Sequence, residues 1–262
     1  MLAHFGDIPL SSIDRSACLA YAKKRGRDQA ARRELEDLRA AIGHWLGDDL
    51  LAMRVNIELP QKAPAREIWH TRDEMARLIW TAWRKSQPTP NGGKRYVARH
   101  IARFMLVGLY TGTRATAICE AALGPAVGRG YVDLEQGVFY RRAPGTAETT
   151  KRRPPVRLHP KLLAHIRRWQ AKGICRSAVV EWLGKPVLRV SKGYRAVSEA
   201  AGIKSSPHAL RHTAVTLAMQ AGAPIYETAA FFGMTVEMLQ KVYGHHHPEH
   251  QSGVLAAIGG RK

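Results

Sequence analysis

The chain has 262 residues, room for one large domain or two ordinary ones, and its 45% apolar content is enough for a packed core. It carries 41 lysines and arginines against 21 aspartates and glutamates, and the resulting formal net charge of +20 favours a polyanion such as DNA as its partner. The sequence lacks an apolar run near the roughly 20 residues that cross a bilayer, a secretion signal and a paired cysteine pattern, which argues against membrane, secreted and disulfide-bonded proteins and predicts a cytoplasmic one.

The first 62 residues predict a small helical domain. One helix is expected to begin with Ser11 or Ser12 as its N-cap and to end before Gly26. A second helix is expected over residues 28–46, because apolar residues recur on one stripe at helical spacing. The members of that stripe are Leu35, Leu38, Ile42 and Trp45.

The opposite face of this second helix is rich in arginine. We interpret Arg32 and Arg33 as contacts to DNA phosphates, with a solvated charged face as the alternative interpretation. A linker follows, because Pro60 and Pro64 both block the continuation of a helix. A second domain is therefore expected over residues 66–262.

The second domain is expected to begin with two helices separated by a loop. Residues 71–74 read Thr-Arg-Asp-Glu, a capping-box pattern that predicts a helix to about Trp83. Residues 88–93 are rich in proline and glycine and predict the loop. The second helix is expected from about Tyr96 to Tyr110.

The sequence Thr-Gly-Thr-Arg follows directly at residues 111–114. Gly112 permits a sharp turn at the end of the preceding helix, and Arg114 then stands beside a new helix start. A basic group at such a junction suits a phosphate site. The alternative is an ordinary surface arginine.

Residues 131–158 change character and predict a small three-stranded antiparallel sheet, with strands over 131–134, 137–140 and 156–158. A basic run, Lys151, Arg152 and Arg153, lies in the loop or edge before the last of these strands. It is either a solvated hairpin tip or a means of carrying a lysine to DNA.

The C-terminal part predicts a succession of helices, and the segment from Pro207 carries most of the chemistry. His208 and Arg211 stand three positions apart, so both side chains project from one face of a helix that begins at Pro207. Tyr243 closes the last of these helices. A tyrosine can attack a phosphodiester if arginines stabilise the developing charge and a base removes the phenol proton.

Taken together, these motifs resemble the tyrosine recombinase (phage integrase) family. The resemblance rests on the Thr-Gly-Thr-Arg sequence, the hairpin lysine, the pattern His208-x-x-Arg211-His212-Thr213, and a tyrosine that follows Phe232-Gly233-Met234. It spans about residues 66–250, while residues 1–60 resemble the helical core-binding domain that precedes the catalytic domain. It implies a mainly α fold of the α+β class.

The resemblance also implies a reaction. The family cleaves and rejoins DNA through a 3′-phosphotyrosyl intermediate, without a metal ion, ATP or other cofactor. It implies a phage or mobile-element setting, double-stranded DNA as partner, a homotetramer on that DNA, no membrane, and association with the nucleoid. The matching residues are Arg114, Lys151 (with Arg152 and Arg153 as neighbours in register), His208, Arg211 and the nucleophile Tyr243.

Two positions depart from the family pattern. Met234 stands nine positions before Tyr243, where the family has a histidine or tryptophan, and Ala117 stands where the family often has an acidic residue. We interpret the histidines at 245–250 as a turn and not a metal site, with His245 as a possible neighbour of the phosphate. A DNA-binding protein that no longer cuts, and a type IB topoisomerase-like enzyme, are the alternative functions.

Overall fold

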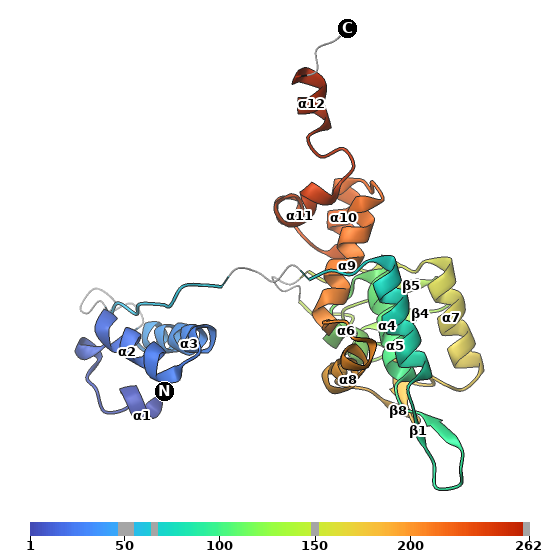
Figure 1. Ribbon diagram of the computed structural model, residues 1–262, viewed down its shortest axis with the longest axis horizontal. Coiled ribbons are helices and arrows are strands. Elements are labelled where there is room, and N and C mark those ends of the chain that lie inside the picture. The colour runs from blue at the N-terminus through green and yellow to red at the C-terminus, as the bar shows by residue number, and fades with distance from the viewer. Residues whose placement is uncertain (47–54, 64–67, 148–151, 259–262) are drawn as a thin grey trace. The chain divides into compact units, whose positions relative to one another are not determined.

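The computed structural model describes residues 1–46, 55–63, 68–147 and 152–258 (Figure 1). The chain divides into two compact units, Met1–Arg66 and Glu67–Lys262, which are described separately below. The fold is mainly α with small sheets, as the sequence predicts. Among the helices of the described ranges, none is long and apolar enough to span a membrane.

The first unit is a helical bundle of α1 (Leu2–Phe5), a 3-10 turn (Leu10–Ser12), α2 (Arg15–Arg25) and α3 (Asp28–Leu46). The N-cap of α2 is Asp14, whose carboxylate accepts a hydrogen bond from the Ala17 amide at 2.8 Å. The predicted cap at Ser11 or Ser12 is therefore wrong, because both serines belong to the preceding 3-10 turn.

The core of this first unit comes from the facing sides of α2 and α3 and from Ile57. Leu35 and Ile42 are buried as the stripe predicts, but Trp45 is 75% exposed. The prediction fails at Trp45 because α2, with 11 residues, is too short to cover the 19 residues of α3.

The second unit begins with the predicted capping box at Thr71 and Glu74, followed by α4 (Arg72–Arg84). Where the sequence predicts only a loop, β1 (Ser86–Pro88) and β2 (Lys94–Tyr96) flank it and pair as an antiparallel hairpin, which projects from the unit in Figure 1. Helix α5 (Arg99–Thr111) follows and packs against α4 and α9 (Pro207–Gln220). It supplies much of the main core.

The central sheet has four strands in the described residues, not the predicted three. Its order is β3 (Ala122–Leu123), β4 (Tyr131–Asp133), β5 (Val138–Tyr140) and β6 (Val156–Arg157). The three predicted strands pair antiparallel, whereas β3 adds to β4 in parallel. Strand β3 was missed because it has two residues and pairs in parallel, so neither alternation nor a hairpin turn marks it in the sequence.

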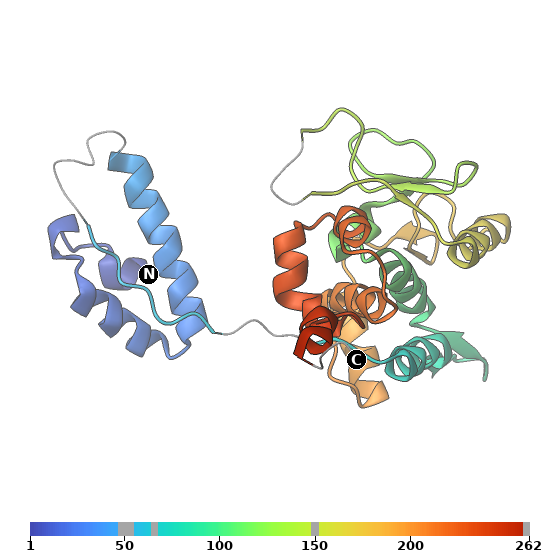
Figure 2. The same cartoon turned by 90° about the horizontal axis from the view of Figure 1, so that it is seen from above.

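The remaining elements are helical apart from one short ribbon. Figure 2 shows α7 beside the sheet. The helices are α6 (Ala115–Glu120), α7 (Pro160–Ala171), α8 (Ser191–Ala201), α10 (Ile225–Phe232), α11 (Val236–Tyr243), the 3-10 turn Gly244–His246 and α12 (Ser252–Ile258), and the ribbon pairs β7 (Glu181–Trp182) with β8 (Lys185–Pro186).

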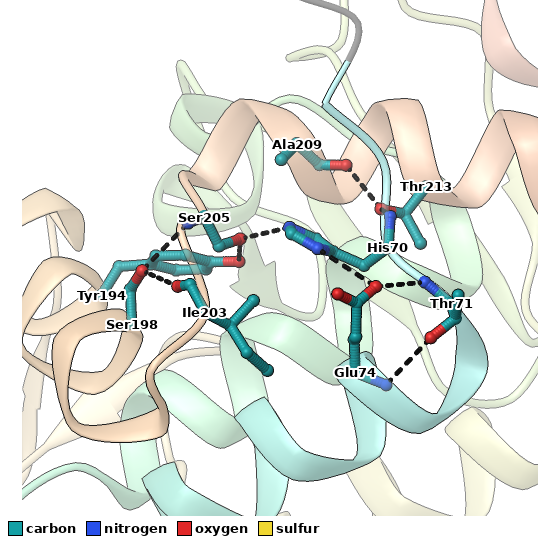
Figure 3. Close-up of polar contacts among 9 residues, drawn as sticks. All are labelled: His70, Thr71, Glu74, Tyr194, Ser198, Ile203, Ser205, Ala209 and Thr213. Carbon is teal, nitrogen blue, oxygen red and sulfur yellow. Dashed lines mark hydrogen bonds and ion pairs between the residues drawn. The ribbon is translucent and has the colours of Figure 1, made fainter.

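A buried polar network holds α9, the helix that carries His208 and Arg211 (Figure 3). The His70 amide donates to the Thr213 hydroxyl at 3.0 Å, and the His70 ring contacts the Ser205 hydroxyl at 2.8 Å. Burial lowers the pKa of His70, against the opposing effect of Glu74. The network fixes the position of α9 relative to the start of the second unit.

Candidate active site

A pocket of about 270 Å³ gathers residues from segments far apart in the sequence. Its lining comes from the start of α6, the loop before β6, the first turn of α9 and the segment from the end of α10 through α11. The lining residues are Arg114, Arg152, His208, Arg211, His212, Gly233, Met234, Thr235, Met238, Val242 and Tyr243. Four of the five residues that the sequence predicts as catalytic therefore meet here.

Arg211 joins three of these segments. Its guanidinium donates to the Gly112 carbonyl at 2.8 Å and to the Phe232 carbonyl at 2.5 Å, and the side chain is buried. Gly112 is left-handed, with φ of 58°, and a Cβ there would lie 2.3 Å from the Phe232 ring. The turn after α5 therefore needs glycine both for its backbone and for its packing.

A third guanidinium, which the sequence analysis missed, lies close to the first two. Arg141 is buried, donates to the Thr111 carbonyl at 2.9 Å, and has no partner for its Nε among the described residues. Arg141 follows β5 two residues after the buried Phe139, so the period-two alternation of a strand was the signal that it points inward.

Burial and neighbouring arginines destabilise the charged forms of the three guanidinium groups. Burial, then Arg211 and then Arg114 lower the pKa of Arg141 to about 9. Burial and Arg114 lower the pKa of Arg211 to about 10. Within the described residues, no carboxylate forms an ion pair with any of the three. Uncompensated positive charge at a pocket favours an anionic ligand.

Tyr243 reaches the pocket from the end of α11. The side chain is 4% exposed, and its hydroxyl lies 2.6 Å from Nδ1 of His212. The Nε2 atom of His212 lies 3.1 Å from Nε2 of His208. His212 thus stands between the two predicted catalytic residues. The signal for it was the four-residue spacing from His208, which places both rings on one helix face.

The loop before β6 closes one side of the pocket. The Arg152 carbonyl accepts a hydrogen bond from Arg114 at 3.1 Å. A Cβ at Gly233 would lie 2.8 Å from this same carbonyl, so the loop and the end of α10 are in close contact. Arg152 is exposed and Arg153 is half-buried. Lys151 lies outside the described residues, and its role stays a prediction.

Among known proteins, solved structures resemble this chain. No family model matches the chain, and no curated protein matches it. The Tn1549 transposon integrase in complex with transposon right end DNA is a structural match, with a TM-score of 0.66 and 15% identity over 97% of this chain and 88% of that one. A lambda integrase dimer bound to a core site is another structural match, with a TM-score of 0.64 and 15% identity over 92% of this chain and 83% of that one.

A third match is the XerA recombinase, with a TM-score of 0.52 and 19% identity over 100% of this chain and 88% of that one. All three are integrases or recombinases. The chain has the tyrosine recombinase fold. Identities this low establish the fold, so the reaction has to be argued from the pocket itself.

Of the two positions that depart from the tyrosine recombinase pattern, Met234 and Ala117, only Met234 is among the residues that line the pocket. Met234 lines the pocket and is half-buried, and its thioether has no proton to donate. Ala117 is buried in α6, three residues after Arg114. Position 234 therefore brings no proton-carrying side chain to the pocket, and position 117 brings no acidic residue to α6.

The structure gives no support to His245 as a phosphate neighbour in this tyrosine recombinase fold. His245 is exposed on the 3-10 turn after Tyr243, and its ring is tilted by 43° against that of His246, with centroids 4.0 Å apart. It is not among the residues lining the pocket. His246 instead borders a smaller hollow together with Tyr243 and His212.

The first unit contains the other predicted DNA contacts. Arg32 donates to the Pro60 carbonyl at 2.6 Å and pairs with Glu36 at 2.9 Å, so its side chain holds the segment after α3. Arg33 is exposed. In the described part of the chain, no group of three or more His, Cys, Asp or Glu side chains could hold a metal ion.

Proposed function

We propose that the chain is a site-specific DNA recombinase that cleaves and rejoins DNA through a covalent bond between Tyr243 and a 3′-phosphate. In this proposal the unit Met1–Arg66 is the core-binding domain and the unit Glu67–Lys262 is the catalytic domain. The observation that carries it is the meeting of Tyr243, Arg211 and Arg114 at one pocket with unpaired positive charge.

The reaction keeps the energy of the broken bond. The Tyr243 oxygen attacks phosphorus, the bond from phosphorus to the 5′-oxygen breaks, and the 3′-phosphate becomes a tyrosyl ester. The phenol proton goes to a base, and the departing 5′-oxygen takes a proton from an acid, for which Lys151 is the predicted donor. Attack by a 5′-hydroxyl from another strand reverses these steps and completes strand exchange.

The arginines stabilise the transition state of both steps. Negative charge grows on the non-bridging oxygens of the phosphate, and guanidinium groups held in place by backbone carbonyls need little reorganisation to meet it. Arg211 has two such carbonyl partners and Arg114 has one. Buried Arg141 adds charge behind them without lining the pocket.

A nicked suicide duplex tests the proposal. Bound sequences are first selected from a random duplex pool, and a nick is then placed so that the short cleaved strand diffuses away and leaves the ester trapped. We expect a covalent protein–DNA adduct with the wild-type chain and none with Tyr243→Phe. Stable binding of the selected DNA without any adduct from the wild-type chain would contradict the proposal.

That contrary result would support a second function, a DNA-binding protein that does not cut. The observation that favours this alternative is Met234, which brings no proton donor or acceptor to the pocket. Tyr243→Phe would then leave both DNA affinity and DNA topology unchanged.

We also propose that copies of the chain associate through α12. Val254, Leu255 and Ile258 on this helix are 59%, 66% and 79% exposed. A groove of about 740 Å³, lined mostly by apolar side chains of α4, α5, α9 and α10, offers a matching surface. An apolar helix and an apolar groove on one unit suit exchange of the helix between neighbouring copies, up to a homotetramer on DNA.

The oligomeric state on DNA tests this association. Leu255→Glu places a charge on the apolar face of α12. We therefore expect copies that bind DNA half-sites singly, without assembling into a tetramer, and slower strand exchange. Loss of assembly with retained single-site cleavage would support helix exchange. Unchanged assembly, or efficient relaxation of supercoiled DNA by a lone wild-type copy, would favour the topoisomerase-like alternative.

A further inference from the structure

We propose that His212 takes the proton from Tyr243 and passes its own proton to His208, so that two histidines one helical turn apart act as a relay. The proposal rests on the proposed function and assigns the base for its first step. It gives His212 a role that the sequence analysis did not, and it makes His208 the second member of the relay.

Tyr243, His212 and His208 lie in one chain of contacts. The phenol oxygen of Tyr243 lies 2.6 Å from Nδ1 of His212, a short distance for a hydrogen bond to nitrogen. On the far side of the same ring, Nε2 lies 3.1 Å from Nε2 of His208. The two imidazoles meet edge to face, with centroids 4.7 Å apart. One ring therefore contacts the nucleophile and the other ring at once.

The protons can be assigned from these contacts. If the phenol donates to Nδ1 of His212, that nitrogen carries a lone pair, and neutral His212 holds its proton on Nε2. That Nε2–H then donates to Nε2 of His208, which must carry a lone pair, so neutral His208 holds its proton on Nδ1. Both rings are neutral and the chain of donors runs in one direction.

The transfer balances. As the Tyr243 oxygen bonds to phosphorus, its proton moves to Nδ1 of His212, and the proton on Nε2 of His212 moves to Nε2 of His208. His212 ends neutral and His208 ends as an imidazolium at the pocket. The positive charge therefore arrives beside the phosphate, where it offsets charge on the non-bridging oxygens.

The charges around His208 make its proton affinity depend on whether a phosphate is bound. Burial, then Arg211, then Arg114 lower the pKa of His208, so the empty pocket keeps its ring neutral and able to accept. The other groups that line the pocket beside it are Arg152, His212 and Tyr243. A bound phosphate offsets the arginines and raises the proton affinity of His208, so the phenol loses its proton only when a phosphate is in place.

Single-turnover cleavage of the nicked duplex, measured across pH, tests the relay. For His212→Gln, whose amide can still accept a hydrogen bond from the phenol, we expect cleavage slower on the order of 100-fold at neutral pH. The deficit should shrink as pH rises toward the phenol pKa of about 10, because hydroxide then does the work of the base. For His212→Ala, added imidazole should restore part of the rate.

A substrate with sulfur in place of the 5′-oxygen separates base from acid, because a thiolate leaves without a proton. The deficit of His212→Gln should persist on this substrate if His212 acts as the base. His165→Gln, an exposed histidine on α7, is the matched control and should cleave like the wild type.

The outcomes are distinct from those of the proposed function. No adduct from the wild-type chain would overturn the function itself. A wild-type adduct together with a His212→Gln rate equal to wild type at every pH would overturn the relay alone. So would a deficit that is independent of pH and unaffected by imidazole, since a purely structural role for His212 predicts that result.

Discussion

The side chains at the pocket are arranged around charge that the protein itself does not neutralise. Burial and neighbouring arginines lower the pKa of Arg114, Arg141 and Arg211, and among the described residues none of them has a carboxylate partner. Two carbonyls hold Arg211 in place, so the charge cannot swing away into solvent. The folded state therefore carries an electrostatic cost that a bound phosphate removes.

Inorganic phosphate should consequently stabilise the folded protein. At concentrations well above its dissociation constant we expect a gain of about 1 to 3 kcal/mol, seen as a higher Tm than in chloride at equal ionic strength. Arg141→Met should lose part of this gain, because it removes one of the three charges. Arg195→Gln, a change at an exposed arginine of α8, should keep it. Equal phosphate effects in both variants would contradict the prediction.

At the scale of single residues, the sequence predicted which residues belong to the pocket better than it predicted which side chains they contact. Arg114, His208, Arg211 and Tyr243 carry residue types whose chemistry points to a phosphate, and all four line the pocket. His212 and Arg141 were missed because their importance lies in what they touch, a phenol in one case and two other guanidinium groups in the other. Local spacing indicates the face from which each side chain projects, but not the distant segment that it contacts.

The elements that hold the pocket depend on two close approaches. Gly112 ends α5 against the Phe232 ring, and the His70 network ties the start of the unit to α9. The first brings α10 to the turn that carries Arg114, and the second fixes the helix that carries His208. Both contacts lie beside the pocket residues and neither supplies one.

Gly112→Ala should destabilise the protein by more than about 3 kcal/mol, because it adds a Cβ 2.3 Å from the Phe232 ring to an already left-handed backbone. Gly202→Ala is the matched control. Gly202 ends α8 with φ of 65° and has nothing within 4 Å of its Cβ, so only the backbone penalty of about 1 kcal/mol applies. Urea unfolding of the two variants measures the difference, and equal losses would show that the ring contact is unimportant.

The pH dependence of stability should show the His70 network. Burial lowers the folded pKa of His70 below the ordinary 6.5, so below that pH the unfolded chain binds more protons than the folded one. Stability should therefore fall as pH falls from about 6.5 toward the folded pKa, by up to about 1.4 kcal/mol per pH unit for this one group.

His70→Gln should make this decline shallower, because its amide can still contact Ser205 but does not titrate. The decline should not vanish, since burial also lowers the pKa of His100, to about 4. Urea unfolding at several pH values gives the two slopes. Identical slopes for the variant and the wild type would show that His70 does not contribute.

At this scale the sequence predicted what periodicity and capping encode. The capping box at Thr71 and the helices of the second unit follow from spacing and end signals. The parallel strand β3 and the exposure of Trp45 did not follow, because pairing partners and the length of a facing helix are set by the tertiary structure. The N-cap of α2 is Asp14 and not one of the predicted serines, because both serines belong to the preceding 3-10 turn.

On the scale of the whole molecule, the chain has a net charge of +20 and a mainly α fold shared with integrases and recombinases, and these two features support our proposal that it binds DNA. Charge supplies affinity without sequence preference, so DNA binding should weaken steeply with salt. A protein that binds DNA without cutting it could have the same fold and the same charge. Only the chemistry at Tyr243 separates the two functions.

Mass spectrometry of the trapped adduct addresses that chemistry directly. After the wild-type chain reacts with the nicked duplex and both partners are digested, we expect a peptide in which Tyr243 carries a nucleotide through its 3′-phosphate. The same peptide should be unmodified in the Tyr243→Phe variant. A modified residue other than Tyr243, or an adduct that survives in the phenylalanine variant, would contradict this expectation.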